Sequence, residues 1–271
     1  MIEYLYQILQ TSQALFFLTM VVCLILGLEF GTRLGARRRA VIGERADEGA
    51  NLAVGSVLGL MAFVLALNLS NASTRYEMRM HATLEEVNAI GTALMQAGAV
   101  GGDEADVLVA DLKDYLVLRH RYVQATRFSG EIPRLNAETD ALQGKIWGEL
   151  TRRLEASTTP ATSSLMNAIN NAFDSSTAMR LAMEYRMPIQ LIGLLLLLSV
   201  LGTAAVGYQF GLTRRRGRAP GILLSILWCV IVTEIIDIGS ARIWSFRTDT
   251  RVYEWSLDSL GLLPEAGGDQ P

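Results

Sequence analysis

The sequence contains few of the residues from which metal and redox sites are built. Among its 271 residues there are two cysteines and two histidines. Cys23 and Cys229 both lie inside apolar runs, which excludes a disulfide framework and a cysteine-based zinc site. His81 and His120 are isolated from each other in the sequence, so they are expected on the surface and not as metal ligands. We therefore expect no metal and no cofactor.

Short catalytic motifs are absent as well. The chain contains no G-x-S-x-G, Walker, H-E-x-x-H or glycine-rich dinucleotide motif. A net charge of −3 argues against a nucleic-acid partner, which requires a basic surface. The apolar content of 51% excludes a disordered chain. We expect a protein that is not an enzyme and that has no catalytic residues.

Charge is missing from four long stretches of the chain, at 4–28, 49–74, 187–213 and 219–233. A bilayer core about 30 Å thick requires roughly 20 apolar residues of helix. The sequence therefore predicts an integral, multi-pass membrane protein with transmembrane helices at about 10–31, 50–72, 189–211 and 219–239. The first span is not expected to be a signal peptide, because Glu3 precedes it and Glu29 and Arg33 replace a small-residue cleavage site.

Arginines predict an orientation. They gather between spans one and two and between spans three and four, and short basic loops are retained in the cytoplasm. Both termini and the segment between spans two and three should then be extracytoplasmic. Four further arginines flank the membrane on the opposite side and weigh against this. The loop arginines are Arg33, Arg37, Arg38, Arg39, Arg45, Arg214, Arg215, Arg216 and Arg218; the opposing ones are Arg75, Arg79, Arg180 and Arg186.

The segment between spans two and three, residues 75–186, has helical periodicity throughout and no strand signal. The second span is expected to continue as one helix from Ala50 to Ala97, roughly 72 Å, which is more than twice the bilayer core. The predicted fold is all-α, with four transmembrane helices and a helical-bundle insertion that extends helix two out of the membrane. The predicted divisions are a membrane hairpin at 1–74, the bundle at 75–186, a second hairpin at 187–240 and a tail at 241–271.

Polar residues near the membrane suggest sites of function. Glu234 and Asp237 lie three residues apart on the fourth span. Acidic side chains inside a membrane are costly, so they usually mark a functional site. These two acids are candidates for a cation or proton site in a water-filled cavity, or for pairing with a basic residue such as Arg242 or Arg75. Alternatively, the helix ends early and both acids are interfacial. Asn68, Ser70, Asn71 and Ser73 mark the exit of the second span, either as a pore mouth or as a polar transition zone.

Three runs at this exit resemble a known family. Residues 65–70 read L-A-L-N-L-S, 75–79 read R-Y-E-M-R and 86–92 read E-V-N-A-I-G-T. They are similar to the bacterial bestrophin-like membrane proteins, an uncharacterised-domain family with R-Y-E-x-R-type and E-x-N-A-I-G-T-type segments. The likeness covers most of the chain, and Asp237 and Arg242 keep part of the family signature after the last helix. The motif residues carried over are Arg75, Tyr76, Glu77, Arg79, Glu86 and Asn88.

The resemblance implies a function. Bestrophins proper are oligomeric anion channels whose second helix lines the pore. This chain would then be a subunit of a homo-oligomeric channel in a bacterial inner membrane, with Leu65, Asn68 and Asn71 as pore-lining candidates. Bestrophins place the insertion in the cytoplasm, which conflicts with the arginine pattern. Calcium gating is not carried over, because the acids Asp249, Glu254 and Asp258 are scattered.

Two other hypotheses remain open. The insertion is far longer than a connector requires, which favours a non-conducting scaffold or sensor whose helical bundle binds a protein partner. Movement of cations or protons through Glu234 and Asp237 is the third possibility.

Overall fold

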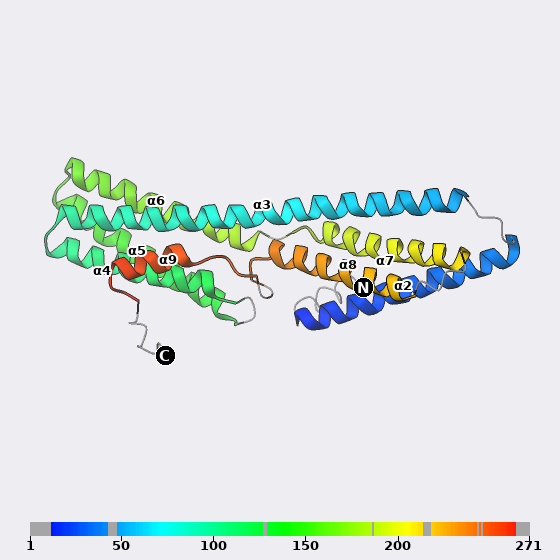
Figure 1. Cartoon of the computed structure of the whole chain (residues 1–271). Helices are drawn as coiled ribbons and strands as arrows, with labels where there is room; N and C mark the ends of the chain where they lie inside the picture. Colours follow the sequence, from blue (N-terminus) through cyan, green and yellow to red (C-terminus); the bar gives the residue numbers. More distant parts are fainter. Residues whose placement is uncertain are drawn as a thin grey trace. The chain divides into compact units, whose positions relative to one another are not determined.

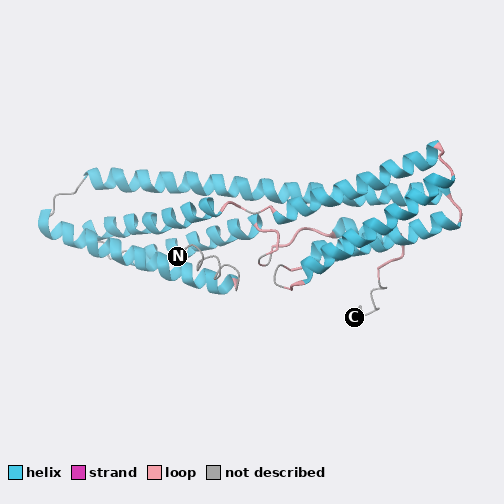
Figure 2. Ribbon diagram, turned by 180° about the vertical axis from the view of Figure 1, so that it is seen from behind, coloured by secondary structure: helices cyan, strands magenta, loops and turns pink. Residues whose placement is uncertain are grey.

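The computed structural model describes residues 12–42, 48–126, 129–185, 187–213, 218–242, 244 and 246–263. These residues form helices and loops with no strand among them (Figure 2), which confirms the all-α prediction. The N-terminal end of the first predicted span, Arg45, Arg186, Arg214, Arg215, Arg216 and the end of the tail at 264–271 lie outside the described residues. The helices are α2 (Gln13–Ile42), α3 (Glu48–Val100), α4 (Asp103–Gln124), α5 (Glu131–Ala156), α6 (Pro160–Glu184), α7 (Ile189–Leu212), α8 (Arg218–Gly239) and α9 (Arg251–Ser259) (Figure 1).

Four of these helices, α2, α3, α7 and α8, are long and apolar enough to cross a membrane, as predicted. The bounds of α7 and α8 agree with the predicted spans to within one residue. By contrast, α2 continues to Ile42, so that Arg33 and Arg37 to Arg39 lie on the helix and not in a loop. No proline interrupts this stretch, and a continuing helix keeps satisfying its own backbone hydrogen bonds.

Helix α3 is the continuous extension that the sequence predicts. It has 53 residues, which corresponds to about 80 Å at 1.5 Å per residue. It ends at Val100, where Gly101 and Gly102 adopt φ values of 67° and 90°. Only glycine occupies this left-handed region without a steric penalty, so the two glycines form the turn into α4.

The chain divides into two compact units. The membrane unit comprises 1–74 and 186–240, and the bundle unit comprises 75–185 and 241–271. In the membrane unit, α2 and α7 pack backbone against backbone. A Cβ atom on Gly31 would overlap the carbonyl of Ala204, and one on Gly207 would overlap the carbonyl of Leu28. Glycines four residues apart permit this approach, at Gly27, Gly31 and Gly35 on α2 and at Gly207 and Gly211 on α7.

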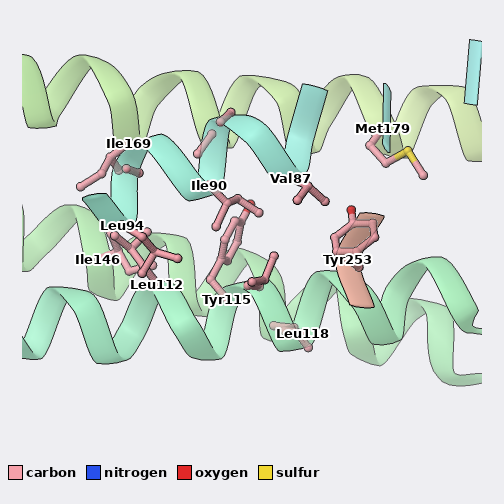
Figure 3. Close-up of a cluster of buried hydrophobic side chains, with 14 of the residues drawn as sticks. Val87, Ile90, Leu94, Leu112, Tyr115, Leu118, Ile146, Ile169, Met179 and Tyr253 are labelled. Atoms are coloured by element: carbon pink, nitrogen blue, oxygen red, sulfur yellow. The ribbon is translucent and has the colours of Figure 1, made fainter. Parts of the chain in front are cut away.

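The bundle unit has its own hydrophobic core. Ile90 of α3, Leu112 of α4, Ile146 of α5 and Ile169 of α6 are fully buried together (Figure 3). Burial of such side chains removes apolar surface from water, at about 25 cal/mol per Å². This core holds α3, α4, α5 and α6 of the insertion against one another.

The segment after residue 240, predicted as a C-terminal tail, contributes to this unit. Its helix α9 has nine residues, too few for an isolated helix to be stable in water. Its Tyr253 is fully buried and its Leu257 almost so, both within the core cluster of the bundle unit. The packing of these two side chains therefore holds α9 in place.

Candidate functional site

Helix α3 has two different faces in the membrane unit. Val54, Met61, Val64, Asn68 and Ala72 are buried against the rest of the unit. On the side away from these residues, small side chains recur at steps of three and four residues, next to the exposed Leu52 and Phe63. Gly55, Gly59, Ala62, Ala66 and Ser70 are exposed there, and Ser73 is half-buried. We call these six residues the small-residue face; no atom lies within 4 Å of a Cβ built on Gly55 or Gly59.

The three pore-lining candidates do not share one face of α3. Asn68 is 2% exposed, and its Nδ2 donates to the carbonyl of Val64 at 2.8 Å. Asn71 is exposed, with Nδ2 donating to the carbonyl of Leu67 at 3.0 Å. Leu65 is half-buried. The side chain of Asn68 therefore faces its own chain, whereas that of Asn71 is exposed.

The two acids of α8 lie in different surroundings although they are three residues apart. Glu234 is exposed, whereas Asp237 is 1% exposed. Within the residues that the structure describes, no group of three or more His, Cys, Asp or Glu side chains could hold a metal ion. A cation path that uses both acids would therefore have to run from Glu234 at the surface of the unit to Asp237 in its interior.

The family-motif residues all lie on α3 in the bundle unit. Arg75 stacks on the ring of Tyr185 at 4.5 Å and donates from Nη1 to its carbonyl at 3.2 Å. Tyr76 packs edge-on against Phe246, with ring centroids 5.1 Å apart. Arg79 and Glu86 are buried, while Glu77 and Asn88 are exposed. The contacts of Arg75 and Tyr76 therefore join the start of the motif to the residue after α6 and to the segment before α9.

Glu86 is the centre of a buried polar network. Nε of Arg119, on α4, donates to its Oε1 at 2.5 Å, and the hydroxyl of Tyr253, on α9, donates to its Oε2. Arg119 also donates from Nη2 to the carbonyl of Ser176, on α6, at 3.4 Å. These contacts join α3, α4, α6 and α9 through one carboxylate. Because both carboxylate oxygens are hydrogen-bonded, the charge is tolerated in the interior.

Electrostatics in this network follow from burial and pairing. Burial is the largest influence and acts to lower the pKa of Arg119, but the charge and hydrogen bond of Glu86, together with Tyr253 and Tyr115, outweigh it and the pKa is raised. Burial, followed by the charge of Glu86, raises the pKa of Tyr253 well above its ordinary value. Arg119 therefore stays protonated, and the Tyr253 hydroxyl keeps the proton that it donates to Glu86.

A second arginine approaches the same network through Tyr122. The guanidinium carbons of Arg119 and Arg242 each lie 4.4 Å from the centroid of the Tyr122 ring. Arg242 also donates from Nη2 to the carbonyl of Tyr122 at 2.9 Å. Burial lowers the pKa of Arg242, and the nearby Tyr122 and Glu184 partly offset that effect. Burial likewise raises the pKa of Tyr122.

Arg119 and Tyr253 are absent from the sequence-based list of site residues. For Arg119 a signal was present, since it continues the apolar stripe of Leu108, Leu112 and Tyr115 on α4 at a helical step. A charged residue at such a position must find a partner in the interior. For Tyr253 the sequence offers no comparable sign, because its partner Glu86 lies 167 residues earlier.

The chain matches no family model, no curated protein and no solved structure. Its four candidate spans indicate an integral, multi-pass membrane protein. The class is thus an all-helical membrane protein with a separate helical unit between its second and third spans.

Proposed function

We propose that this protein is a subunit of a homo-oligomeric ion channel in a bacterial inner membrane, with α3 lining the pore. The observation that carries the proposal is the small-residue face of α3. A helix surface that faces lipid gains nothing from a row of glycine, alanine and serine side chains. Such a row suits either close approach of another helix or a narrow path between helices from several copies.

The chemistry of this face fits an ion path. Ser70 and Ser73 add hydroxyl groups at one end, and hydroxyls can replace part of the hydration shell of an ion. Residues 49–74 contain no charged side chain, so no acid on this part of α3 repels an anion. Together with the likeness to bestrophins, this supports anion selectivity. Asn71 is exposed and remains a pore candidate, although it lies about 100° around α3 from Ser70 and therefore off this face. We assign Asn68 a structural role, because it is buried against its own chain.

We place the bundle unit on the extracytoplasmic side, from the arginines between paired spans. Reporter fusions near Arg38 and in the turn at 98–102 test this placement. A fusion near Arg38 that reports the cytoplasm, with one in the turn that reports the periplasm, would support it. The reverse result would favour the orientation that the bestrophin likeness implies.

Conduction is tested with purified protein in a planar bilayer under a salt gradient. Unitary currents should reverse toward the chloride potential. A chain with Ser70→Cys, in a background with Cys23→Ser, should lose most of its current when a charged methanethiosulfonate is added. Leu223→Cys is the matched control, because Leu223 is exposed on α8 and lies outside the proposed pore. A strictly monomeric particle in mild detergent, or equal current loss in both variants, would contradict the proposal.

A second candidate function is a non-conducting scaffold or sensor, and a groove on the bundle unit favours it. The groove has a volume of about 500 Å³ and lies between α4 and α5. Val117, Leu118 and Leu142 supply apolar lining, with Asp114, Arg121, Glu138 and Lys145 as the charged lining residues. Apolar side chains surrounded by charged ones are typical of a protein-binding surface.

This alternative is separated from conduction by filling the groove. Ala141→Trp places a large side chain in it, whereas Trp147→Ala alters the same helix without adding bulk to the groove. Loss of crosslinked partners in cells with Ala141→Trp alone, with currents unchanged, would favour the scaffold. Unchanged partners and unchanged phenotype would leave the groove without a role.

A further inference from the structure

The membrane unit contains an apolar cavity between α2, α3 and α7. Its volume is about 270 Å³, whereas one water molecule occupies about 30 Å³ of the liquid. Apart from the phenol of Tyr208, the lining residues are apolar, and they include Leu34 of α2, Ala53 of α3 and Ala205 of α7. Such a lining offers water too few hydrogen-bond partners, so a cavity of this kind takes an apolar guest.

The cavity is open toward the outer surface of the helices. Phe30, which also lines it, is 66% exposed, Leu34 is 48% exposed, and Ala53 is exposed as well. All three residues belong to candidate membrane spans, so the medium outside the cavity is the hydrocarbon of a bilayer. The apolar groups that reach the cavity are therefore the acyl chains of lipids.

Two arginines follow the cavity along the same side of α2. Arg37 and Arg38 come three and four residues after Leu34, about one turn further, on the face that Phe30 and Leu34 share. Both are exposed, and neither forms an ion pair with a carboxylate of the described residues. Arg33, by contrast, is paired with Glu29 at 3.1 Å. A guanidinium group matches the oxygens of a phosphate in a bidentate geometry.

The other two helices become polar at the same end of the cavity. Nε2 of Gln209 donates to Oδ1 of Asn51 at 3.0 Å. Gln209 directly follows Tyr208 on α7, and Asn51 lies two residues before Ala53 on α3. An apolar cavity thus leads to polar and basic side chains, which is the sequence of groups along a phospholipid from its acyl chains to its phosphate.

From this arrangement we propose that the membrane unit binds one anionic phospholipid, with an acyl chain in the cavity and the phosphate on Arg37 and Arg38. Basic side chains next to a cavity between membrane helices suit anionic headgroups. The site requires a bilayer around the unit, but it does not require that the unit conduct ions.

The test uses the full-length chain, stripped of lipid in detergent and titrated with phosphatidylglycerol in mixed micelles. Native mass spectrometry counts the lipids bound per chain. We expect saturation at one phosphatidylglycerol, with a Kd about tenfold or more below that of phosphatidylcholine with the same acyl chains, because two basic residues attract the anionic headgroup. Glycerophosphoglycerol, which is the same headgroup without acyl chains, should not compete.

Two changes examine the two ends of the site. Ala53→Phe fills the cavity from α3 and should raise the Kd for phosphatidylglycerol about tenfold or more. Leu52→Phe is the matched control, because it places the same ring on the neighbouring residue, which is 75% exposed and lies outside the cavity. The double variant Arg37→Gln with Arg38→Gln should lose the preference for phosphatidylglycerol. Arg33→Gln should keep it, since Glu29 already neutralises that arginine.

A raised Kd in Ala53→Phe but not in Leu52→Phe, with the preference lost only in the double arginine variant, supports the site. No saturation at one lipid per chain, or equal Kd values in Ala53→Phe and Leu52→Phe, overturns it. A preference that survives the loss of both arginines overturns the position of the phosphate. Should Ala53→Phe fail to fold by circular dichroism, Ala205→Leu fills the cavity from α7 and decides instead. A silent planar bilayer leaves these results unaffected, so failure of the channel proposal is distinguishable.

Discussion

Arg119 and Glu86 form an ion pair, 2.5 Å from Nε to Oε1, in which neither side chain is more than 1% exposed. The two residues come from different helices, α4 and α3, and the pair lies within the core of the bundle unit. Such a pair stabilises a fold only while it is complete, because either partner alone is an uncompensated buried charge. The consequence can be measured with single and double variants.

Arg119→Met is expected to lower the free energy of unfolding by about 3–5 kcal/mol, since it leaves the Glu86 carboxylate without its cation. The double variant Glu86→Gln with Arg119→Met should cost less than the sum of the two single changes. Denaturant unfolding of the full chain in detergent measures each value. Arg152→Met is the surface control, with a cost below about 1 kcal/mol. Additive single and double effects would show that the two residues are not coupled.

Tyr253→Phe should loosen the docking of α9. The change removes the hydroxyl that donates to Glu86 but keeps the buried ring. A hydrogen bond to a charged group contributes about 1.5–3 kcal/mol, so amide exchange in 251–259 should become about tenfold faster or more. Trp255→Phe changes an exposed ring of the same helix and should leave exchange unaltered. Equal protection of the α9 amides from exchange in both variants would show that the hydrogen bond from Tyr253 to Glu86 does not hold α9 in place.

Stability should fall with acidification in a way that depends on His120. Burial lowers the pKa of His120 below its ordinary value of 6.5, with Glu254 partly offsetting this. Below pH 6.5 the unfolded chain therefore takes up a proton at this residue that the folded chain resists, and stability decreases as the pH falls. The thermal midpoint should drop between pH 7.5 and 5.5, and less so in His120→Gln. His81→Gln, at an exposed histidine, should keep the full drop.

Two sets of glycines should respond differently to enlargement. Gly207→Leu forces a side chain into the backbone of α2, so it should destabilise the membrane unit by at least about 1–3 kcal/mol. Gly59→Leu meets no atom of its own chain and should leave the thermal midpoint nearly unchanged. If α3 faces other copies, Gly59→Leu should instead reduce the oligomer in native mass spectrometry. An oligomer that tolerates Gly59→Leu would remove the support for a pore along this face.

Glu234 tests the remaining hypothesis of cation or proton movement. Its side chain is exposed on α8, apart from the small-residue face of α3. Glu234→Gln should leave the amplitude and reversal potential of the proposed current within the scatter of the parent. Abolished flux in this variant would transfer the ion path from α3 to α8. Ser70→Cys without reagent is a suitable parallel variant, since it changes the proposed pore face by one atom.

The sequence by itself determined the four candidate spans and the all-helical fold. In a bilayer, each backbone polar group must be bonded within the segment, so uncharged stretches of about 20 residues leave few structures other than helices. The long extension of α3 also follows from the sequence, because no proline precedes the glycines at 101 and 102. Glycines four residues apart occur in α2, α3 and α7, but the sequence could not show which of them make contact. Those at 31 and 207 do so, and those at 55 and 59 do not.

Only the tertiary structure decided the polar network of the bundle unit. Glu86 lies 33 residues from Arg119 and 167 from Tyr253, so no local pattern connects them. The same holds for the predicted tail, whose α9 is too short to be stable until its two apolar side chains find the core. Helical periodicity fixes which face of a segment is buried. Which partner lies opposite a buried charge is set by packing between distant segments, and this packing placed Arg119, Arg242 and Tyr122 together.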